Sequence, residues 1–174
     1  MKFLIILPSL LALLFPLAVS AQESDSAMLK LVKDKAQAMV TATLKGDYEE
    51  VVKATYGPAL ETLGGSDGAL ETIKQQMDQM KASGMKIVKF DLGDPKKIFS
   101  TPEMAFVILP TSTEMSIPQA TVNAKSYLLG LSSDQGKSWK FVDGSGLASK
   151  PEWLPKLPEG FELPKLSNPI VTPK

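Results

Sequence analysis

The side chains that carry out most protein chemistry are few in this chain of 174 residues, which contains no histidine, no cysteine and no arginine. Histidine titrates near neutral pH without help, and cysteine supplies thiolates and disulfides. Arginine grips carboxylates and phosphates with parallel hydrogen bonds. Any acid–base chemistry therefore falls to Asp, Glu, Tyr and Lys. We assign no catalytic residue, no metal ligand and no cofactor from the sequence.

The strongest candidates for a binding site are one acid and two tyrosines: Asp143, Tyr56 and Tyr127. A carboxylate in an apolar pocket can act as a base, and a phenol can donate to a developing oxyanion. Asp143 precedes Gly144 at the end of a predicted strand, where it could equally cap a turn. Both tyrosines have apolar neighbours, so a buried ring with its hydroxyl at the surface also explains them. We treat the three as candidate ligand-binding residues.

One motif predicts a specific local shape. Residues 132–139, SSDQGKSW, match the Asp-box pattern Ser-x-Asp-x-Gly-x-Ser/Thr-Trp at every specified position. The pattern predicts a hairpin turn in which Asp134 accepts backbone hydrogen bonds and Gly136 adopts a positive φ. Trp139 then begins the return strand and buries its ring against the turn. Such boxes resemble those repeated in sialidase propellers, but a propeller needs several boxes and far more chain. Sialidases also bind a carboxylate with arginines, so the box predicts a hairpin only.

The first residues predict an export signal. A basic start is followed by an apolar run from Phe3 to Leu17 and by small residues up to Ala21. The run is short for a membrane span of about 20 residues and contains two prolines. We therefore predict a cleaved signal peptide over residues 1–21 and a periplasmic or secreted protein. Without a cysteine to acylate, no membrane attachment is expected after cleavage.

The mature chain is almost neutral. Removal of Lys2 leaves 18 of the 19 lysines against 19 acids, a formal charge of −1. With no basic surplus and no arginine for bidentate base contacts, nucleic acid is not an expected partner. The lack of cysteine means that packing, rather than disulfides, must stabilise the exported domain.

Helical patterns occupy the first half of the mature chain. We predict a helix over residues 24–45 ended by Gly46, a second capped by Asp47 and followed by a further turn, and a third capped by Ser66 or Asp67. The apolar stripe of the first helix has helical spacing. Its members are Met28, Leu31, Val32, Lys35, Met39 and Val40.

From Met85 the apolar period changes to two, which indicates strands. Val88, Phe90 and Leu92 are predicted to share one face of the first strand. Further strands are expected around residues 98–99, at 103–109 as a central strand covered on both faces, at 119–132 and at 139–143. Helices followed by antiparallel strands predict an α+β fold.

The last residues form a proline-rich extension, 149–174, beyond a domain at 22–148. Six of the 13 prolines lie there, which excludes a helix or an inner strand and predicts an extended segment. The segment is too apolar for a free linker, so we expect a strap over the domain's own surface rather than a docking arm. The apolar residues concerned are Trp153, Leu154, Leu157, Phe161, Leu163 and Leu166.

The order of elements resembles the nuclear transport factor two-like superfamily. The resemblance covers residues 24–146 and rests on Gly46-Asp47-Tyr48, Tyr56-Gly57-Pro58 and the final strand from Trp139 to Asp143. It implies a cone in which a bent sheet wraps around a long helix. The superfamily includes ketosteroid isomerase-like and dehydratase-like enzymes and non-catalytic binding domains. The lack of histidine departs from the dehydratase pattern.

Three functional hypotheses follow. The first is an exported, non-catalytic domain that binds a small apolar ligand or a protein partner. The alternative is a cofactor-free isomerase or cyclase with Asp143 as base and Tyr56 or Tyr127 as donor. The third is an interaction protein whose sheet or proline-rich arm engages an envelope partner. A homodimer is an open alternative for the oligomeric state.

Overall fold

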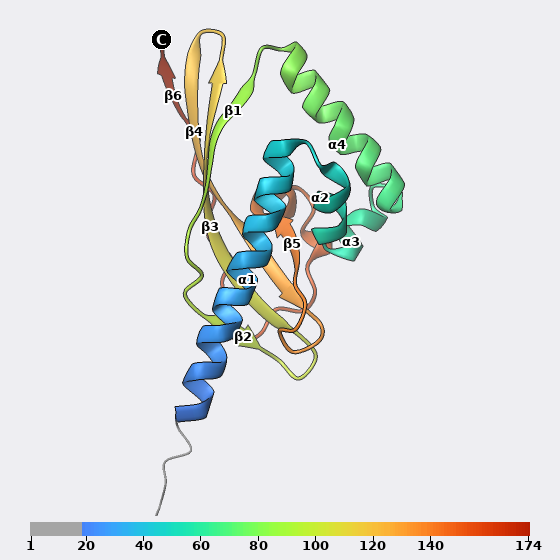
Figure 1. Ribbon diagram of the computed structural model, residues 1–174, viewed down its shortest axis with the longest axis vertical. Coiled ribbons are helices and arrows are strands. Elements are labelled where there is room, and N and C mark those ends of the chain that lie inside the picture. The colour runs from blue at the N-terminus through green and yellow to red at the C-terminus, as the bar shows by residue number, and fades with distance from the viewer. Residues whose placement is uncertain (1–18) are drawn as a thin grey trace, which may run out of the picture.

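The structure, a computed structural model, describes residues 19–174, so most of the predicted signal peptide lies outside the described residues. Helices are followed by a curved, unclosed, six-stranded sheet whose named strand pairs are all antiparallel (Figure 1). This arrangement confirms the predicted α+β fold class.

The element bounds are as follows. The helices are α1 (Val19–Lys45), α2 (Tyr48–Ala54), α3 (Gly57–Glu61), α4 (Gly65–Ala82) and α5 (Gly144–Ser149), with a 3-10 turn η1 (Pro151–Trp153). The strands are β1 (Lys86–Leu92), β2 (Ile98–Ser100), β3 (Ala105–Ile117), β4 (Ala120–Ser132), β5 (Lys140–Asp143) and β6 (Ile170–Pro173).

The helix ends follow local chemistry. Gly46 ends α1 with a φ of 76°, and the side chain of Asp47 caps α2 by accepting from the Glu50 amide, as predicted. The predicted cap of α4 was wrong. The helix begins two or three residues earlier, after Gly64, whose left-handed φ of 84° precedes α4 without any side-chain cap.

The β3–β4 hairpin is the spine of the sheet. Its register is continuous from the pair Ala105↔Ser132 to the pair Ile117↔Ala120. We call residues 105–109 and 128–132 the base of the hairpin, and residues 111–117 and 120–126 its tip. At the base the hairpin is flanked by β2 and β5, and at the tip by β1 and β6.

Strand β3 continues past the proline at which the predicted strand ended. In an antiparallel strand the N–H and C=O of one residue point to the same side. The carbonyl of Pro110 accepts a hydrogen bond from the Gly93 amide at 2.8 Å. The backbone nitrogen of Pro110, which carries no hydrogen, therefore also points towards the junction between β1 and β2 and away from β4. No bond of the β3–β4 ladder is lost, which is why proline is tolerated there.

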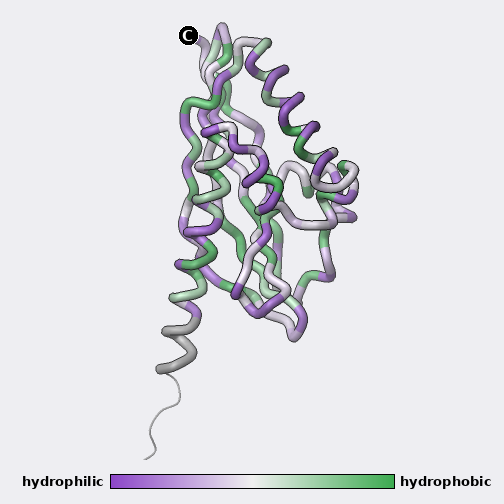
Figure 2. The backbone as a smooth tube through the Cα atoms, turned by 45° about the vertical axis from the view of Figure 1, so that its right-hand side comes forward, coloured by the Kyte–Doolittle hydropathy of each residue, from purple (hydrophilic) through white to green (hydrophobic). Residues whose placement is uncertain are grey.

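Helix α1 covers one face of the base. Val32 and Ala36 are fully buried against Val107, Leu109 and Phe141. The predicted stripe was wrong at one position, because Lys35 is exposed and Ala36 takes the buried place. The strands beside α1 are mostly hydrophobic in colour in Figure 2, whereas α4 alternates between polar and apolar residues.

The opposite face of the base is covered by α3, α5 and the proline-rich segment. Phe161 is 7% exposed, and its ring meets Phe99 edge-on at 5.0 Å and Phe106 at 5.6 Å between centroids. Trp153, Leu154, Leu157 and Leu163 pack around the same cluster. The segment is thus a strap, as predicted, except that Leu166 is 39% exposed and that residues 170–173 end the chain as a strand.

The predicted face of β1 was wrong at Val88. A bulge shifts the register between Ile87 and Lys89, so Val88 is unpaired and 59% exposed. Ile87 takes its place on the same side as Phe90 and Leu92. A bulge of this kind cannot be seen in the alternation of residue types.

The packing of the strap predicts that two alanine substitutions within it have unequal effects on stability. Phe161→Ala removes a buried ring from the core and should lower the free energy of unfolding by about 3 kcal/mol. Leu166→Ala, in the same strap but partly exposed, should change it by less than about 0.5 kcal/mol. Urea denaturation measures both. Equal, small effects would show that the strap adds nothing to the core.

Candidate functional site

An open groove of about 730 Å³ lies between α1, α2 and the turn that leads into β5. Its volume is in the range of ligand-binding sites. The α1 wall extends from Asp34 to Lys45, which at 1.5 Å per residue is about 16 Å. We call this hollow the α1–α2–β5 groove.

The second wall is the Asp-box turn, which has the predicted geometry. Asp134 accepts the Ser138 amide at 2.8 Å and the Ser138 hydroxyl at 2.6 Å. The Ser132 hydroxyl donates to Asp134 at 2.8 Å and accepts the Gly136 amide at 2.8 Å. These bonds lower the pKa of Asp134 to about 2, with the Ser138 hydroxyl as the largest cause. The turn therefore holds residues 137–139 in a fixed position beside α1.

The Asp-box turn is also fitted to α1. Gly136 has a φ of 84°, and a Cβ at this position would lie 2.4 Å from the sulfur of Met28. The positive φ favours glycine here, and a larger residue would also require the flexible Met28 side chain to move. Trp139 is 5% exposed and donates from its indole nitrogen to the Gly136 carbonyl at 3.1 Å, which ties the floor of the groove to the turn.

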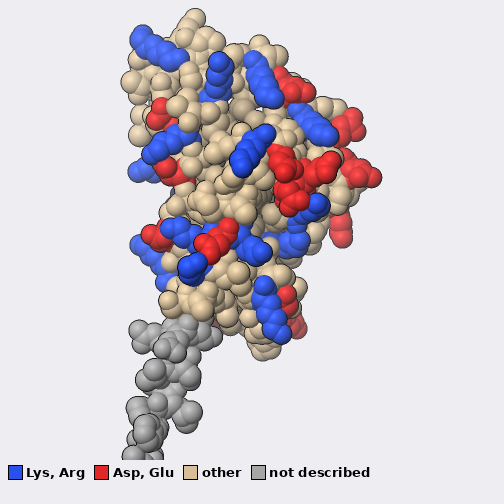
Figure 3. Space-filling view, in the orientation of Figure 1, with Lys and Arg blue, Asp and Glu red and all other residues tan. Residues whose placement is uncertain are grey.

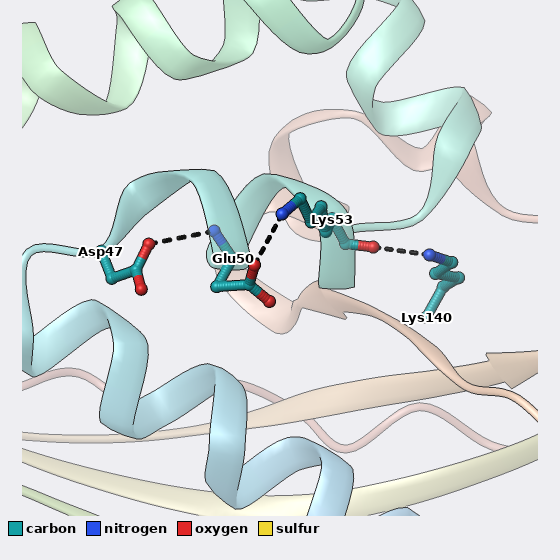
Figure 4. Close-up of polar contacts among 4 residues, drawn as sticks. All are labelled: Asp47, Glu50, Lys53 and Lys140. Carbon is teal, nitrogen blue, oxygen red and sulfur yellow. Dashed lines mark hydrogen bonds and ion pairs between the residues drawn. The ribbon is translucent and has the colours of Figure 1, made fainter.

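The third wall is α2, which is linked to β5 through lysine (Figure 4). Glu50 forms an ion pair with Lys53 at 2.6 Å, and this bond raises the pKa of Lys53. The ammonium of Lys140 donates to the Lys53 carbonyl at the end of α2, at 2.5 Å. A cation at a helix C-terminus is favourable because the last carbonyls have no partner within the helix.

The floor of the groove is apolar. Phe141 is fully buried and Trp139 nearly so, while Met39, Ala42 and Ala54 complete the lining from the helices. The rim is charged, with two more lysines than acids. The lysines are Lys35, Lys45, Lys53, Lys137 and Lys140, and the acids are Asp34, Asp47 and Glu50.

The three acids of the rim are already engaged. Asp34 pairs with Lys30 at 2.9 Å, Asp47 caps α2, and Glu50 holds Lys53. Among the described residues, no carboxylate pairs with Lys35, Lys45 or Lys137. Figure 3 shows that the helical side of the molecule carries charges of both signs, without one broad surface of a single sign. Within the lining of the groove itself, lysines outnumber acids by two.

The sequence candidates Tyr127 and Asp143 lie near each other at the junction of β4, β5 and α5. Tyr127 packs on the face of the sheet opposite α1, whereas Asp143 pairs with Leu128, which packs on the α1 face. Tyr127 is 4% exposed, and burial raises its pKa, with a smaller contribution from the charge of Asp143. Asp143 caps α5 by accepting the Ser145 amide at 2.8 Å and the Ser145 hydroxyl. Its other oxygen is 3.5 Å from the Ser126 hydroxyl. The Tyr127 ring lies directly under Gly144.

Tyr56 also packs on that face, before α3, where its amide donates to the Phe141 carbonyl at 3.0 Å and burial raises its pKa. The structure thus brings the two tyrosines to the side covered by α3, α5 and the strap, while Asp143 is used at the end of β5 to cap α5. None of them lines the α1–α2–β5 groove. Their ligand-binding role stays a prediction.

Sequence reasoning missed the groove, although two signals were present. The Asp box fixed the turn that forms one wall. The second signal was Lys35, a charged residue at a position of the predicted stripe that should be apolar.

Of the described helices, none is long and apolar enough to span a membrane. Among the side chains of residues 25–174, no group of three acids converges as a metal site would require. Searches of protein-family models, curated proteins and solved structures find no match to the chain.

The pKa of Asp134 predicts a pH-dependent contribution to stability. Its folded value of about 2 lies below the ordinary value of 3.8, so the ionised carboxylate stabilises the fold above about pH 4. This contribution is lost as the pH falls towards 2. Asp134→Asn should therefore be destabilised relative to the parent at pH 6, and the difference should shrink towards zero near pH 2.

Urea denaturation across this pH range measures the difference, with Asp67→Asn as a control for the loss of one surface charge. A destabilisation of Asp134→Asn that stays constant from pH 6 to pH 2 would contradict the role given to the carboxylate charge.

Proposed function

We propose that this protein is an exported, non-catalytic binding domain that holds a segment of a protein partner in the α1–α2–β5 groove. The sequence is compatible with two classes of ligand, a small apolar molecule and a protein partner. The geometry of the groove favours the protein partner. Export rests on the signal pattern of residues 1–21, and membership of the nuclear transport factor two-like superfamily remains a prediction.

The observation that carries the proposal is that the space between α1 and the sheet is filled by the chain's own side chains. Val32 and Ala36 of α1 and Val107, Leu109 and Phe141 of the sheet are all 0% exposed. An apolar ligand enclosed by the cone would need these side chains to be absent. The remaining hollow is open, long and polar at its rim, which suits an extended chain better than a small apolar molecule.

The non-catalytic part of the proposal rests on how the candidate residues are used. Asp143 is occupied as the cap of α5, and Tyr127 is nearly covered by Gly144 and its neighbours. An acid–base pair must reach a common substrate atom in an accessible cavity. In the accessible groove, each carboxylate already bonds to a lysine or to the backbone.

The lack of cysteine allows a direct test. A single cysteine in place of Ala38, an exposed residue of the α1 wall, can carry a photo-crosslinker without any background labelling. Irradiation in the exported fraction of the native host should give a defined adduct, which mass spectrometry identifies. The purified partner should then form the same adduct. The matched control is Gln76→Cys, exposed on α4 and outside the groove.

Adducts that are the same from both positions, or adducts that the purified partner fails to reproduce, would contradict the proposal. So would a bound apolar compound extracted from the native protein, because it would require an enclosed cavity.

A further inference from the structure

We infer that the segment held in the α1–α2–β5 groove is an acidic peptide whose carboxylates flank apolar side chains. This inference rests on the proposed function and adds the chemistry of the partner. It comes from the combination of an apolar floor with a rim of lysines that lack partners within the described residues.

The charge of the rim favours a negatively charged ligand. Each rim acid has a partner inside the protein, as described above, whereas Lys35, Lys45 and Lys137 make no ion pair with the side chains of residues 25–174. Incoming carboxylates could pair with these three ammonium groups without displacing any existing bond. An incoming basic segment would meet only acids that are already engaged. Electrostatic complementarity of this kind sets specificity and the rate of association.

The geometry selects a peptide over other anions. Lys35 and Lys45 stand at opposite ends of the α1 wall, about 15 Å apart along the helix axis. A single phosphate cannot reach both, whereas about five residues of extended chain can. The floor between them, with Met39, Ala42 and Trp139, offers apolar contact that a polyphosphate or a sulfated sugar cannot use.

The Asp box fixes one of these lysines. Lys137 lies between Gly136, which is seated on Met28, and Ser138, which is bonded to Asp134. The backbone of Lys137 is therefore held in place before a ligand arrives, and only its side chain must be ordered. A preorganised anchor lowers the entropic cost of binding.

The test uses a fluorescein-labelled peptide of about twelve residues with glutamates around two leucines, and a second peptide in which glutamines replace the glutamates. Fluorescence anisotropy at about 20 mM NaCl, where screening is weak, measures affinity. The glutamate peptide should bind, and the glutamine peptide should bind about tenfold more weakly. The double variant Lys35→Glu/Lys137→Glu should weaken binding of the glutamate peptide by a similar factor.

The control is Lys96→Glu/Lys165→Glu, which makes the same change in net charge at exposed lysines outside the groove. It should leave the affinity unchanged, and melting curves of both double variants establish that they fold. Equal weakening by both pairs would overturn the inference, because it would show a general charge effect. Competition by polyphosphate as strong as that by the glutamate peptide would also overturn it, in favour of an unspecific polyanion site.

The photo-crosslinking experiment separates this inference from the proposed function. A partner captured specifically from position 38, whose affinity is unchanged by Lys35→Glu/Lys137→Glu, would overturn the acidic chemistry alone. Loss of the position-specific adduct would overturn both.

Discussion

The structure depends on one constraint: the base of the β3–β4 hairpin is apolar on both faces, so both faces must be covered. Odd-numbered residues of β3, such as Val107 and Leu109, meet α1, while Phe106 meets the strap. A strand buried on both faces is usual where helices lie on either side of a sheet. Here the second cover is built from short helices and a proline-rich segment. The cysteine-free domain thus gains a second core without a disulfide, and most of the chain after β5 is used for this purpose.

Coverage of the base also determines where a binding site can form. Since α1 is seated deeply on one face and the strap on the other, neither face retains an enclosed space at the base. The groove arises instead where α1, α2 and the Asp-box turn converge beside the sheet edge formed by β5. Its floor, Trp139 and Phe141, belongs to the same cluster that α1 buries. The lining of the groove and the core therefore share these two rings, and the charged rim is the part of the groove that can vary without loss of the core.

Much of the fold could be predicted from the sequence because it is set by short-range patterns. Glycines ended the helices, alternation marked β1 and β4, and the eight residues of the Asp box described their own turn correctly. Apart from the cap of α4, the following errors occur where long-range contacts decide. The bulge at Val88 depends on how β1 pairs with β3. The continuation of β3 beyond Pro110 depends on the gap between β1 and β2. The exposure of Lys35 depends on where α2 and β5 lie. The groove is formed by three distant segments, so no local pattern could reveal it.

The edges of the sheet give a physical reason for placing a partner in the groove rather than along a strand. The amide of Lys174 donates to the Gln119 carbonyl at 3.1 Å, so Lys174 faces β4. Alternation then turns Pro173 towards the free edge of β6, where its missing N–H removes a donor. At the other edge of the tip, the bulge at Val88 lies between Lys86 and Lys89 and interrupts the regular ladder of β1. Bulges, lysines and prolines are the features by which edge strands avoid pairing with another chain. A partner that added a strand at the tip would meet these obstacles, whereas one laid along α1 would meet an apolar floor and unpaired lysines.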